Sequence, residues 1–282
     1  MSKAKNNITY LLIYVSAAIS VLLLAGIIVY VSVKGIGAIS IPFLTQVKSA
    51  VKETEGIAGN IVNTLYIIVI TLLFATPIGV GSAIYLNEYA KPGRFVRLVE
   101  FTTQTLSGIP SILFGLFGMI FFGSVLHLRY SILTGALTLT LMILPLIIGN
   151  TREALKTVPE SYRQGAIGMG AEKWYMIRTI LLPSAMPGIL TGVILSVGRI
   201  VGESAALLFT AGSAYILPAS AKGYFSKILE PGGTLTIELY LNMTKAKYDV
   251  AFGIALVLLV IVFIINLLTK IIVKKWSQNE HR

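Results

Sequence analysis

The sequence contains no cysteine and only two histidines, His127 and His281. Without cysteine there is no disulfide framework, no thiolate metal site and no cysteine nucleophile. The two histidines are too few and too far apart for a histidine cluster, so no metal site is expected. A Gly-x-x-x-x-Gly-Lys-Ser/Thr run is also missing, so the chain does not cradle a nucleoside triphosphate as a P-loop does.

Charge is scarce as well. Charged residues make up 12% of the chain and apolar residues 55%, whereas an ordinary soluble domain is about 25% charged. The mean hydropathy of +0.83 indicates an integral membrane protein, so the lipid bilayer is one expected partner. The net charge of +11 does not indicate a nucleic-acid partner, because the basic residues lie between apolar runs and not on one patch.

Six segments have the roughly 20 mainly apolar residues that a membrane-spanning helix needs. They are Ile8–Val33, Ile57–Asn87, Phe101–Leu126, Tyr130–Gly149, Ile180–Ala211 and Val250–Thr269. The sequence therefore predicts an all-α integral membrane protein with six transmembrane helices in one domain, residues 1–282. The first segment is longer than the apolar core of a cleavable signal, so it is expected to be a retained helix.

Lysines and arginines are distributed unequally between the two sides of this topology. Fourteen of the 23 lie in the connections on the side that holds both termini, and eight lie on the other side. Because such residues are in excess in cytoplasmic connections, both termini are expected in the cytoplasm. The long opposite segment 212–249 is expected to be a loop with a short surface helix at Thr236–Met243.

The longest polar internal stretch, residues 152–178, is expected on the same side as the termini. Its apolar residues recur at three- and four-residue steps, as on an amphipathic helix. Gly165, Gly168 and Gly170 then weaken the helix, because glycine costs about 1 kcal/mol relative to alanine. We expect two short helices that meet at a glycine elbow on the membrane surface.

Arg199 and Glu203 are charged residues within the fifth predicted span. Their spacing of four would place them on the same face of a helix. Charges at this depth face a bundle interior or a water-filled path and pair with one another. Two interpretations stay open: Arg199 lines the route of an anion with Glu203 as its counter-ion, or the two form a structural ion pair.

The polar stretch resembles the cytoplasmic loop of bacterial ABC importer permeases. That loop has Glu-Ala-Ala, three residues, Gly, nine residues and Ile-x-Leu-Pro, and here the matching residues are Gln164-Gly165-Ala166, Gly170 and Ile180 to Pro183. The opening Glu-Ala has become Gln-Gly. The resemblance implies the MetI-like permease fold. In that fold the elbow, with Gly168 and Trp174, lies between helices 4 and 5 and fits a groove on a separate subunit that binds ATP.

The run from Gly198 to Thr210 resembles the A-type permease subunits of phosphate importers, which have Arg-x-x-Gly-Glu-Thr/Ser-Ala at this place. The resemblance implies that Arg199 and Glu203 are needed for phosphate passage, and Ser204 keeps the hydroxyl. Gly108–Leu116 resembles a second run of these permeases, in which Pro110 would kink the helix. The resemblance extends over residues 56–249 and includes the last span, 250–269.

The family further implies a dimer of ATPase subunits, a second, C-type permease subunit in a heterodimer, and an extracytoplasmic phosphate-binding protein, all at the bacterial plasma membrane. The chain itself is then no enzyme. Alternatives are a permease for molybdate or sulfate, and a proton-coupled carrier with Glu203 as its proton site. The sequence has no recognisable channel filter and no residues for intramembrane enzyme chemistry.

Overall fold

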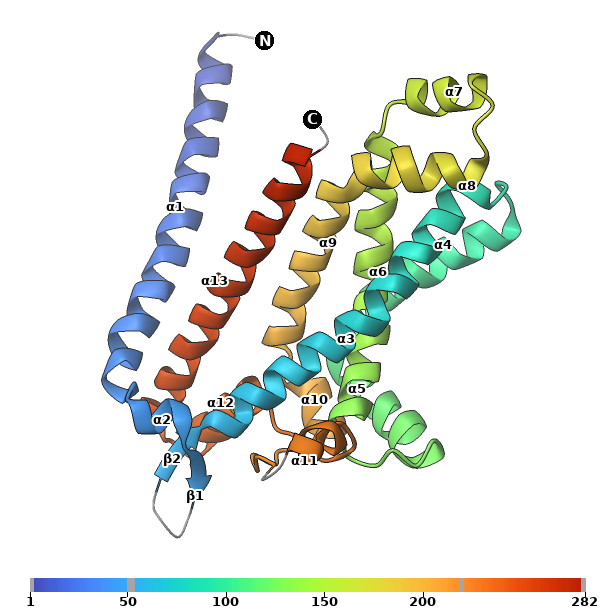
Figure 1. Cartoon of the computed structure of the whole chain (residues 1–282). Helices are drawn as coiled ribbons and strands as arrows, with labels where there is room; N and C mark the ends of the chain where they lie inside the picture. Colours follow the sequence, from blue (N-terminus) through green and yellow to red (C-terminus); the bar gives the residue numbers. More distant parts are fainter. Residues whose placement is uncertain (1–2, 50–53, 219–220, 280–282) are drawn as a thin grey trace.

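The computed structural model describes residues 3–49, 54–218 and 221–279 and is largely helical (Figure 1). The first third contains α1 (Lys3–Gly35), η1 (Ile36–Ala38), α2 (Ile41–Thr45), β1 (Val47–Ser49), β2 (Thr54–Ile57), α3 (Ala58–Ile84) and the π-helical η2 (Tyr85–Tyr89). The middle contains α4 (Arg94–Ser107), α5 (Ser111–Gly118), the π-helical η3 (Met119–Val125), α6 (Ile132–Thr157), α7 (Glu160–Gly168), α8 (Lys173–Met176) and the π-helical η4 (Ile177–Leu181). The last third contains α9 (Leu182–Gly202), α10 (Ala205–Thr210), α11 (Ala221–Ser226), η5 (Lys227–Leu229), α12 (Leu235–Thr244) and α13 (Tyr248–Asn279).

The expected all-α membrane fold is confirmed, with a difference in the third span. Five helical segments of the described chain are long and apolar enough to cross a membrane by themselves. The sixth candidate is the pair of α4 with α5 and η3, which is bent by 104°. The chain leaves the helix at Gly108 because Pro110 disfavours helical backbone at the residue before it. Pro110 therefore separates two helices, which is a sharper break than the predicted kink.

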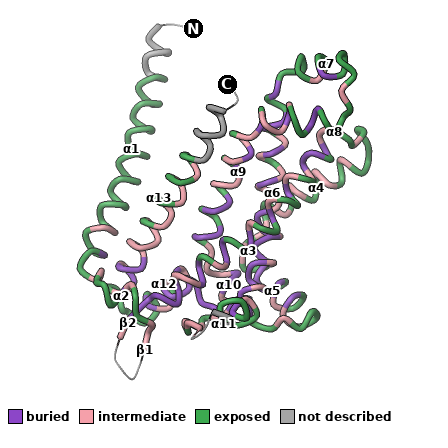
Figure 2. The backbone as a smooth tube through the Cα atoms, viewed as in Figure 1, coloured by how far each residue is buried: buried purple, intermediate pink, exposed green. Residues whose placement is uncertain are grey.

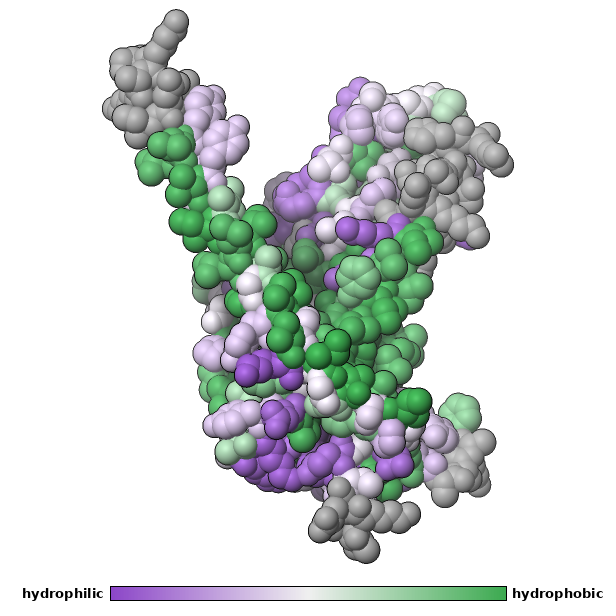
Figure 3. All heavy atoms as spheres, turned by 90° about the vertical axis from the view of Figure 1, so that its left-hand side faces the viewer, coloured by the Kyte–Doolittle hydropathy of each residue, from purple (hydrophilic) through white to green (hydrophobic). Residues whose placement is uncertain are grey.

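The connections gather at two ends of the molecule. In Figure 1, α7 and α8 lie at the same end as the two ends of the chain, and the β1–β2 hairpin, α11 and α12 lie at the other. Figure 3 shows an apolar belt between them, with hydrophilic residues concentrated at the hairpin end. This distribution fits a chain whose middle layer lies in lipid.

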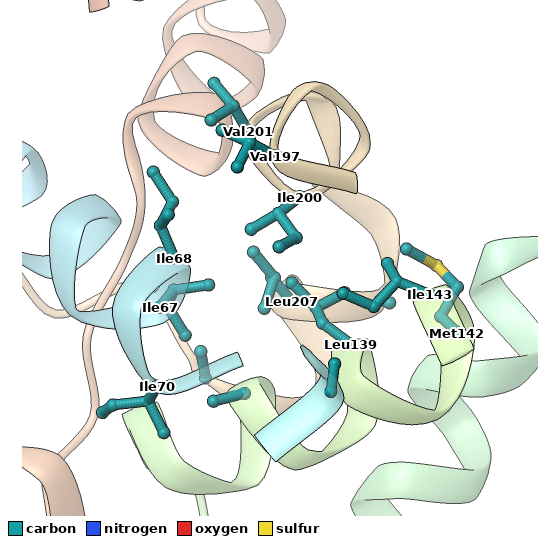
Figure 4. Close-up of a cluster of buried hydrophobic side chains, with 14 of the residues drawn as sticks. Ile67, Ile68, Ile70, Leu139, Met142, Ile143, Val197, Ile200, Val201 and Leu207 are labelled. Atoms are coloured by element: carbon teal, nitrogen blue, oxygen red, sulfur yellow. The ribbon is translucent and has the colours of Figure 1, made fainter. Parts of the chain in front are cut away.

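The core is formed where α3, α6, α9 and α10 pack together. Figure 4 shows Ile67 of α3, Leu139 of α6, Ile200 of α9 and Leu207 of α10 pointing toward one another. Small residues allow the close approach, as is usual between membrane helices. A methyl group on Gly79 would lie 2.6 Å from Cγ2 of Ile147, so α3 and α6 touch backbone to side chain there.

Helix α1 stands apart from this core and is exposed along most of its length (Figure 2). Its contact is with α13, where the rings of Tyr30 and Phe252 meet edge to face at 5.6 Å. Gly35 permits a close crossing, since a methyl group there would lie 2.9 Å from Cβ of Leu256. Residues 9–29 of α1 are exposed and mainly apolar, so they offer a surface to lipid or to another membrane protein.

An ion network ties the hairpin to the helices beside it. Lys48 of β1 pairs with Glu238 of α12 at 2.6 Å and with Glu55 of β2 at 3.4 Å. Lys247 also pairs with Glu55. The helix predicted at Thr236–Met243 is therefore present as α12, but the expectation that it lies on the surface is wrong, because Glu238 and Asn242 are buried.

Candidate substrate path and coupling site

Arg199 lies one turn before the end of α9 and is exposed. Across the ranges that the structure describes, no carboxylate lies within ion-pair distance of its guanidinium. An uncompensated cation in a membrane helix is costly unless water, lipid headgroups or another charged molecule reach it. Arg199 is therefore available to an anion from outside the chain.

The predicted pairing of Arg199 with Glu203 is wrong, because α9 ends at Gly202 and Glu203 has extended backbone angles. The two residues do not share a helical face. Oε1 of Glu203 instead accepts a hydrogen bond of 3.0 Å from the backbone N–H of Ala206. Glu203 thus caps α10, whose first N–H groups have no helical acceptor.

Ser204 opens α10 and lines a cavity of about 220 Å³ together with Ile112, Leu208, Phe209 and Tyr240. Ile112 belongs to α5, directly after the break at Pro110. The broken third span and the start of α10 therefore meet at one cavity. The structure brings Ser204 and the Pro110 break together here, with Glu203 at the adjacent position; the roles of all three in transport remain predictions.

The coupling segment has the predicted elbow, and its geometry explains Gly170. Helix α7 ends in a Schellman motif: the N–H of Gly170 donates to the carbonyl of Ile167 at 2.9 Å, and that of Ala171 to Ala166 at 3.0 Å. Gly170 has φ +77°, a left-handed conformation that favours glycine. Ala166 is buried against Ala171 and holds the elbow on the core.

The outward side of this segment is uncovered. Gln164, Ile167, Met169 and Trp174 are exposed, Met169 to 82%. A methyl group on Gly165 or Gly168 would meet no other atom within 4 Å. Pro183 lies in the first turn of α9, where its missing N–H has no cost. An open apolar surface with exposed backbone is typical of a docking site.

Sequence reasoning missed the residues that anchor the elbow from below. Arg163 donates to Oε1 of Glu88 and to the carbonyl of Leu155, both at 3.0 Å, and to the carbonyl of Val158 at 3.2 Å. Nζ of Lys173 lies 4.9 Å above the ring of Tyr89. Both coupling helices therefore contact the π-helical η2 at the end of α3. A π-helical turn often marks a functional site, but it has no signature in this sequence.

The sequence and the fold of this chain match those of known proteins. Residues 75–278 match the family described as "Binding-protein-dependent transport system inner membrane component". The chain belongs to this family. It is thus an inner-membrane permease component of an ABC importer, and the predicted MetI-like fold is confirmed.

Relatives of nearly the same length support the assignment. The permease is 34% identical over 277 residues to a probable ABC transporter permease, YqgI, of Bacillus subtilis, covering 93% of this chain and 94% of that protein. It is 32% identical over 272 residues to the phosphate transport system permease PstA of Haemophilus influenzae, covering 95% and 94%.

Solved structures show the same fold at lower identity. A bacterial alginate ABC transporter matches 94% of the permease and 93% of its own chain with a TM-score of 0.68 at 16% identity. The methionine transporter MetNI, in an inward-facing conformation, matches 78% and 95% with a TM-score of 0.64 at 21% identity. The fold is therefore shared among permeases whose substrates differ.

Proposed function

We propose that this permease moves inorganic phosphate into the cell. The observation that carries the proposal is the exposed guanidinium of Arg199, which has no carboxylate partner within the described residues. A guanidinium binds phosphate oxygens through two parallel hydrogen bonds. Arg199 lies one turn before the Glu203–Ser204 corner, and Ser204 lines the cavity of about 220 Å³. The phosphate permease PstA among the relatives supports the same substrate.

In this proposal ATP is hydrolysed on a pair of separate ATPase subunits, which dock on the exposed side of α7 and α8. A second, C-type permease chain completes the pore, and an extracytoplasmic binding protein delivers phosphate to the end that carries the hairpin. Both termini then face the cytoplasm together with the elbow. The open surface around Gly165, Gly168 and Trp174 supports this docking side.

The test uses the importer assembled from this permease, the ATPase, the second permease and the binding protein in proteoliposomes. Arg199→Ala is compared with Lys245→Ala, which removes an exposed positive charge at the end of α12. We expect Arg199→Ala to lower phosphate uptake by about ten- to a hundred-fold, since hydrogen bonds to a charged group are worth about 1.5–3 kcal/mol. Assembly and ATP turnover should persist, and Lys245→Ala should transport normally.

Three outcomes would contradict parts of the proposal. Equal and mild losses in both variants would remove Arg199 from the path. If molybdate or sulfate stimulates ATP turnover and phosphate does not, the permease transports a different oxyanion. If no ATPase associates with the chain, docking on α7 and α8 fails, and a proton-coupled carrier using Glu203 becomes the better account.

A further inference from the structure

A second cavity is lined mainly by residues of η3 and of the loop that leads into α6. These segments lie at the end of the molecule opposite α7 and α8 (Figure 1). Its volume is about 430 Å³, and its polar lining consists of Ser124, His127, Arg129 and Tyr130. Among the described residues that line it there is no carboxylate. The cavity therefore presents the guanidinium of Arg129 and the imidazole of His127 without a negative charge. The hydroxyl of Ser124 donates to the carbonyl of Met119 at 3.4 Å and that of Tyr130 to Sδ of Met119 at 3.7 Å, and each hydroxyl can rotate from there to a ligand.

The backbone that presents these side chains is held in an unusual conformation. His127 and Arg129 have φ of 57° and 54°, in the left-handed region that ordinary side chains seldom adopt. Leu128 donates its N–H to Phe122 at 3.1 Å, Arg129 donates its own to Gly123 at 3.0 Å, and the hydroxyl of Thr134 donates to the carbonyl of Arg129 at 2.9 Å. These bonds fix the strained loop, and such strain gathers at ligand sites.

The two side chains themselves are uncommitted. Arg129 and His127 are exposed, and within the described part of the chain neither has an ion-pair or side-chain hydrogen-bond partner. A loop whose backbone is fixed and whose cationic side chains are free is prepared for a ligand at low entropic cost.

This cavity adjoins the one that contains Ser204. Phe209 of α10 lines both, so its ring is part of the wall between them. Tyr130 in turn also lines a third cavity of about 660 Å³ beside Gly212 and Pro231. A route from Arg129 toward Ser204 therefore passes Phe209.

We propose that Arg129, with His127 and the hydroxyls of Ser124 and Tyr130, forms a binding site for a tetrahedral oxyanion, outward of the Ser204 cavity. The guanidinium supplies two parallel donors to the anion, and the imidazole and hydroxyl groups supply further hydrogen bonds. The identity of the anion as phosphate rests on the proposed function. A phospholipid headgroup has the same chemistry, so the experiment separates the two sources.

The absence of cysteine from the native sequence permits a direct test. Gly123→Cys places one thiol in the cavity of the assembled importer, in phospholipid-free detergent, and leaves every proposed ligand in place. A methyl group on Gly123 would lie 3.5 Å from its nearest neighbour, the carbonyl oxygen of Arg129. An anionic and a cationic methanethiosulfonate then report the local potential through the ratio of their modification rates. We expect the anionic reagent to be favoured and Arg129→Gln to lower the ratio, by about sevenfold for each kT of lost potential. Lys245→Gln, which removes a charge at the same end but outside the cavity, is the matched control.

Added phosphate should slow the modification of the thiol, and this effect should saturate, when Arg129 is present. In Arg129→Gln, phosphate should have no effect on the modification rate. An unchanged ratio with Arg129→Gln would overturn the site. Protection that requires phospholipid, in phosphate-free buffer, would make it a lipid site and overturn the inference. If the importer takes up phosphate but phosphate does not protect the thiol from modification, this inference is wrong and the proposed function stands. Protection by molybdate in an importer that transports molybdate would retain the oxyanion site and contradict the proposed function.

Discussion

Glu203 shows how one residue can satisfy two different interpretations. Its carboxylate accepts a hydrogen bond from the backbone of Ala206, a role that needs an oxygen but no charge. Its backbone carbonyl accepts from the hydroxyl of Thr236 at 3.0 Å, which ties the same corner to α12. A transport role would need the negative charge itself. A glutamine, which keeps the oxygen and loses the charge, therefore distinguishes the two roles.

Substitution of Glu203 by Gln and by Ala separates these roles. Gln retains an oxygen for the N–H of Ala206, and Ala removes it. If capping is the whole role, Glu203→Gln should transport phosphate normally and Glu203→Ala should lower stability by about 1 kcal/mol, as lost caps do. Uptake and thermal unfolding of the assembled importer are the measurements. A Gln variant that is stable but inactive would show instead that the charge is required.

Gly170 and Gly168 make a second contrast at single residues. Gly170→Ala forces a side chain into a left-handed position and should destabilise the permease by about 1–2 kcal/mol. Gly168→Ala fills open space in the last turn of α7 and should leave the stability unchanged or raise it by up to about 1 kcal/mol, because alanine favours the helix more than glycine does. If α7 docks on the ATPase, Gly168→Ala should nevertheless weaken co-purification of that subunit. Equal stability of the two variants would contradict the role of the Schellman motif.

At the scale of elements, the Arg163–Glu88 ion pair connects α7 to η2 and, through two carbonyls, to the end of α6. Its side chains are 14% and 6% exposed, so both charges are largely removed from water. Arg163 lies at the junction of α7, η2 and the end of α6.

Breaking this pair should uncouple the elbow from α3. Glu88→Ala removes the buried partner and leaves Arg163 with the exposed carboxylate of Glu160 at 3.3 Å, so the cost should stay below the roughly 3 kcal/mol of a fully unpaired buried charge. We expect Glu88→Ala to lower uptake while ATP turnover continues, and the exchange Glu88→Arg with Arg163→Glu to restore part of the uptake. The matched control is Glu153→Ala, which breaks the exposed pair with Lys156. Normal uptake with Glu88→Ala in a stable importer would disprove mechanical coupling through this pair.

The elements that sequence could predict are those set by local pattern. Long apolar runs indicate the spans, and the glycine-rich amphipathic stretch indicates the elbow. Both features depend on residues that are close together in the sequence, so the local pattern of apolar residues is enough to predict them. Gly170 is singled out by the glycine-rich run and by the family resemblance, and its left-handed conformation is known only from the structure. The break at Pro110 was underestimated, since a proline in a membrane helix can produce a kink or a full turn depending on its neighbours.

Tertiary partners were beyond a single sequence. The assumption that α9 continues past Gly202 placed Arg199 and Glu203 on one face, and the end of the helix separates them. Glu88 lies 75 positions from Arg163, and Lys48 lies 190 positions from Glu238, so no spacing rule connects them. Such pairs depend on how helices cross, which is decided by packing of the whole molecule.

At the scale of the whole molecule, the network of Lys48, Glu55, Glu238 and Lys247 fastens the hairpin to α12 and α13, and it predicts a pH dependence. Burial opposes the charge on Lys48, but Glu238 and Glu55 outweigh it, so the pKa of Lys48 lies above its ordinary value. Burial likewise opposes the charge on Glu55, but Lys247 and Lys48 hold its pKa below the ordinary value. Both groups are charged throughout the neutral range.

Glu55 and Lys48 lose their stabilising effect at opposite ends of the pH range. The stabilisation from Glu55 is present above its ordinary pKa of 4.5 and is lost as pH falls through the depressed value. That from Lys48 is present below its ordinary pKa of 10.5 and is lost as pH rises through the raised value. The protection of the β1 and β2 amides against hydrogen exchange, measured relative to the intrinsic rate at each pH, should therefore fall at both extremes. Glu55→Gln should remove most of the acid-side change, and an unaltered profile would contradict the assignment.

The pairing of α1 with α13 joins the first and the last helices of the described chain. Residues 36–247 separate these two helices, so α1 enters the lipid before its partner has been synthesised. During that interval α1 relies on its own hydrophobicity, since a single apolar helix is stable in a bilayer without tertiary contacts. The α1–α13 contact therefore forms only after the rest of the core helices have been made. Truncated chains that lack the final span will therefore keep α1 in the membrane without docking it.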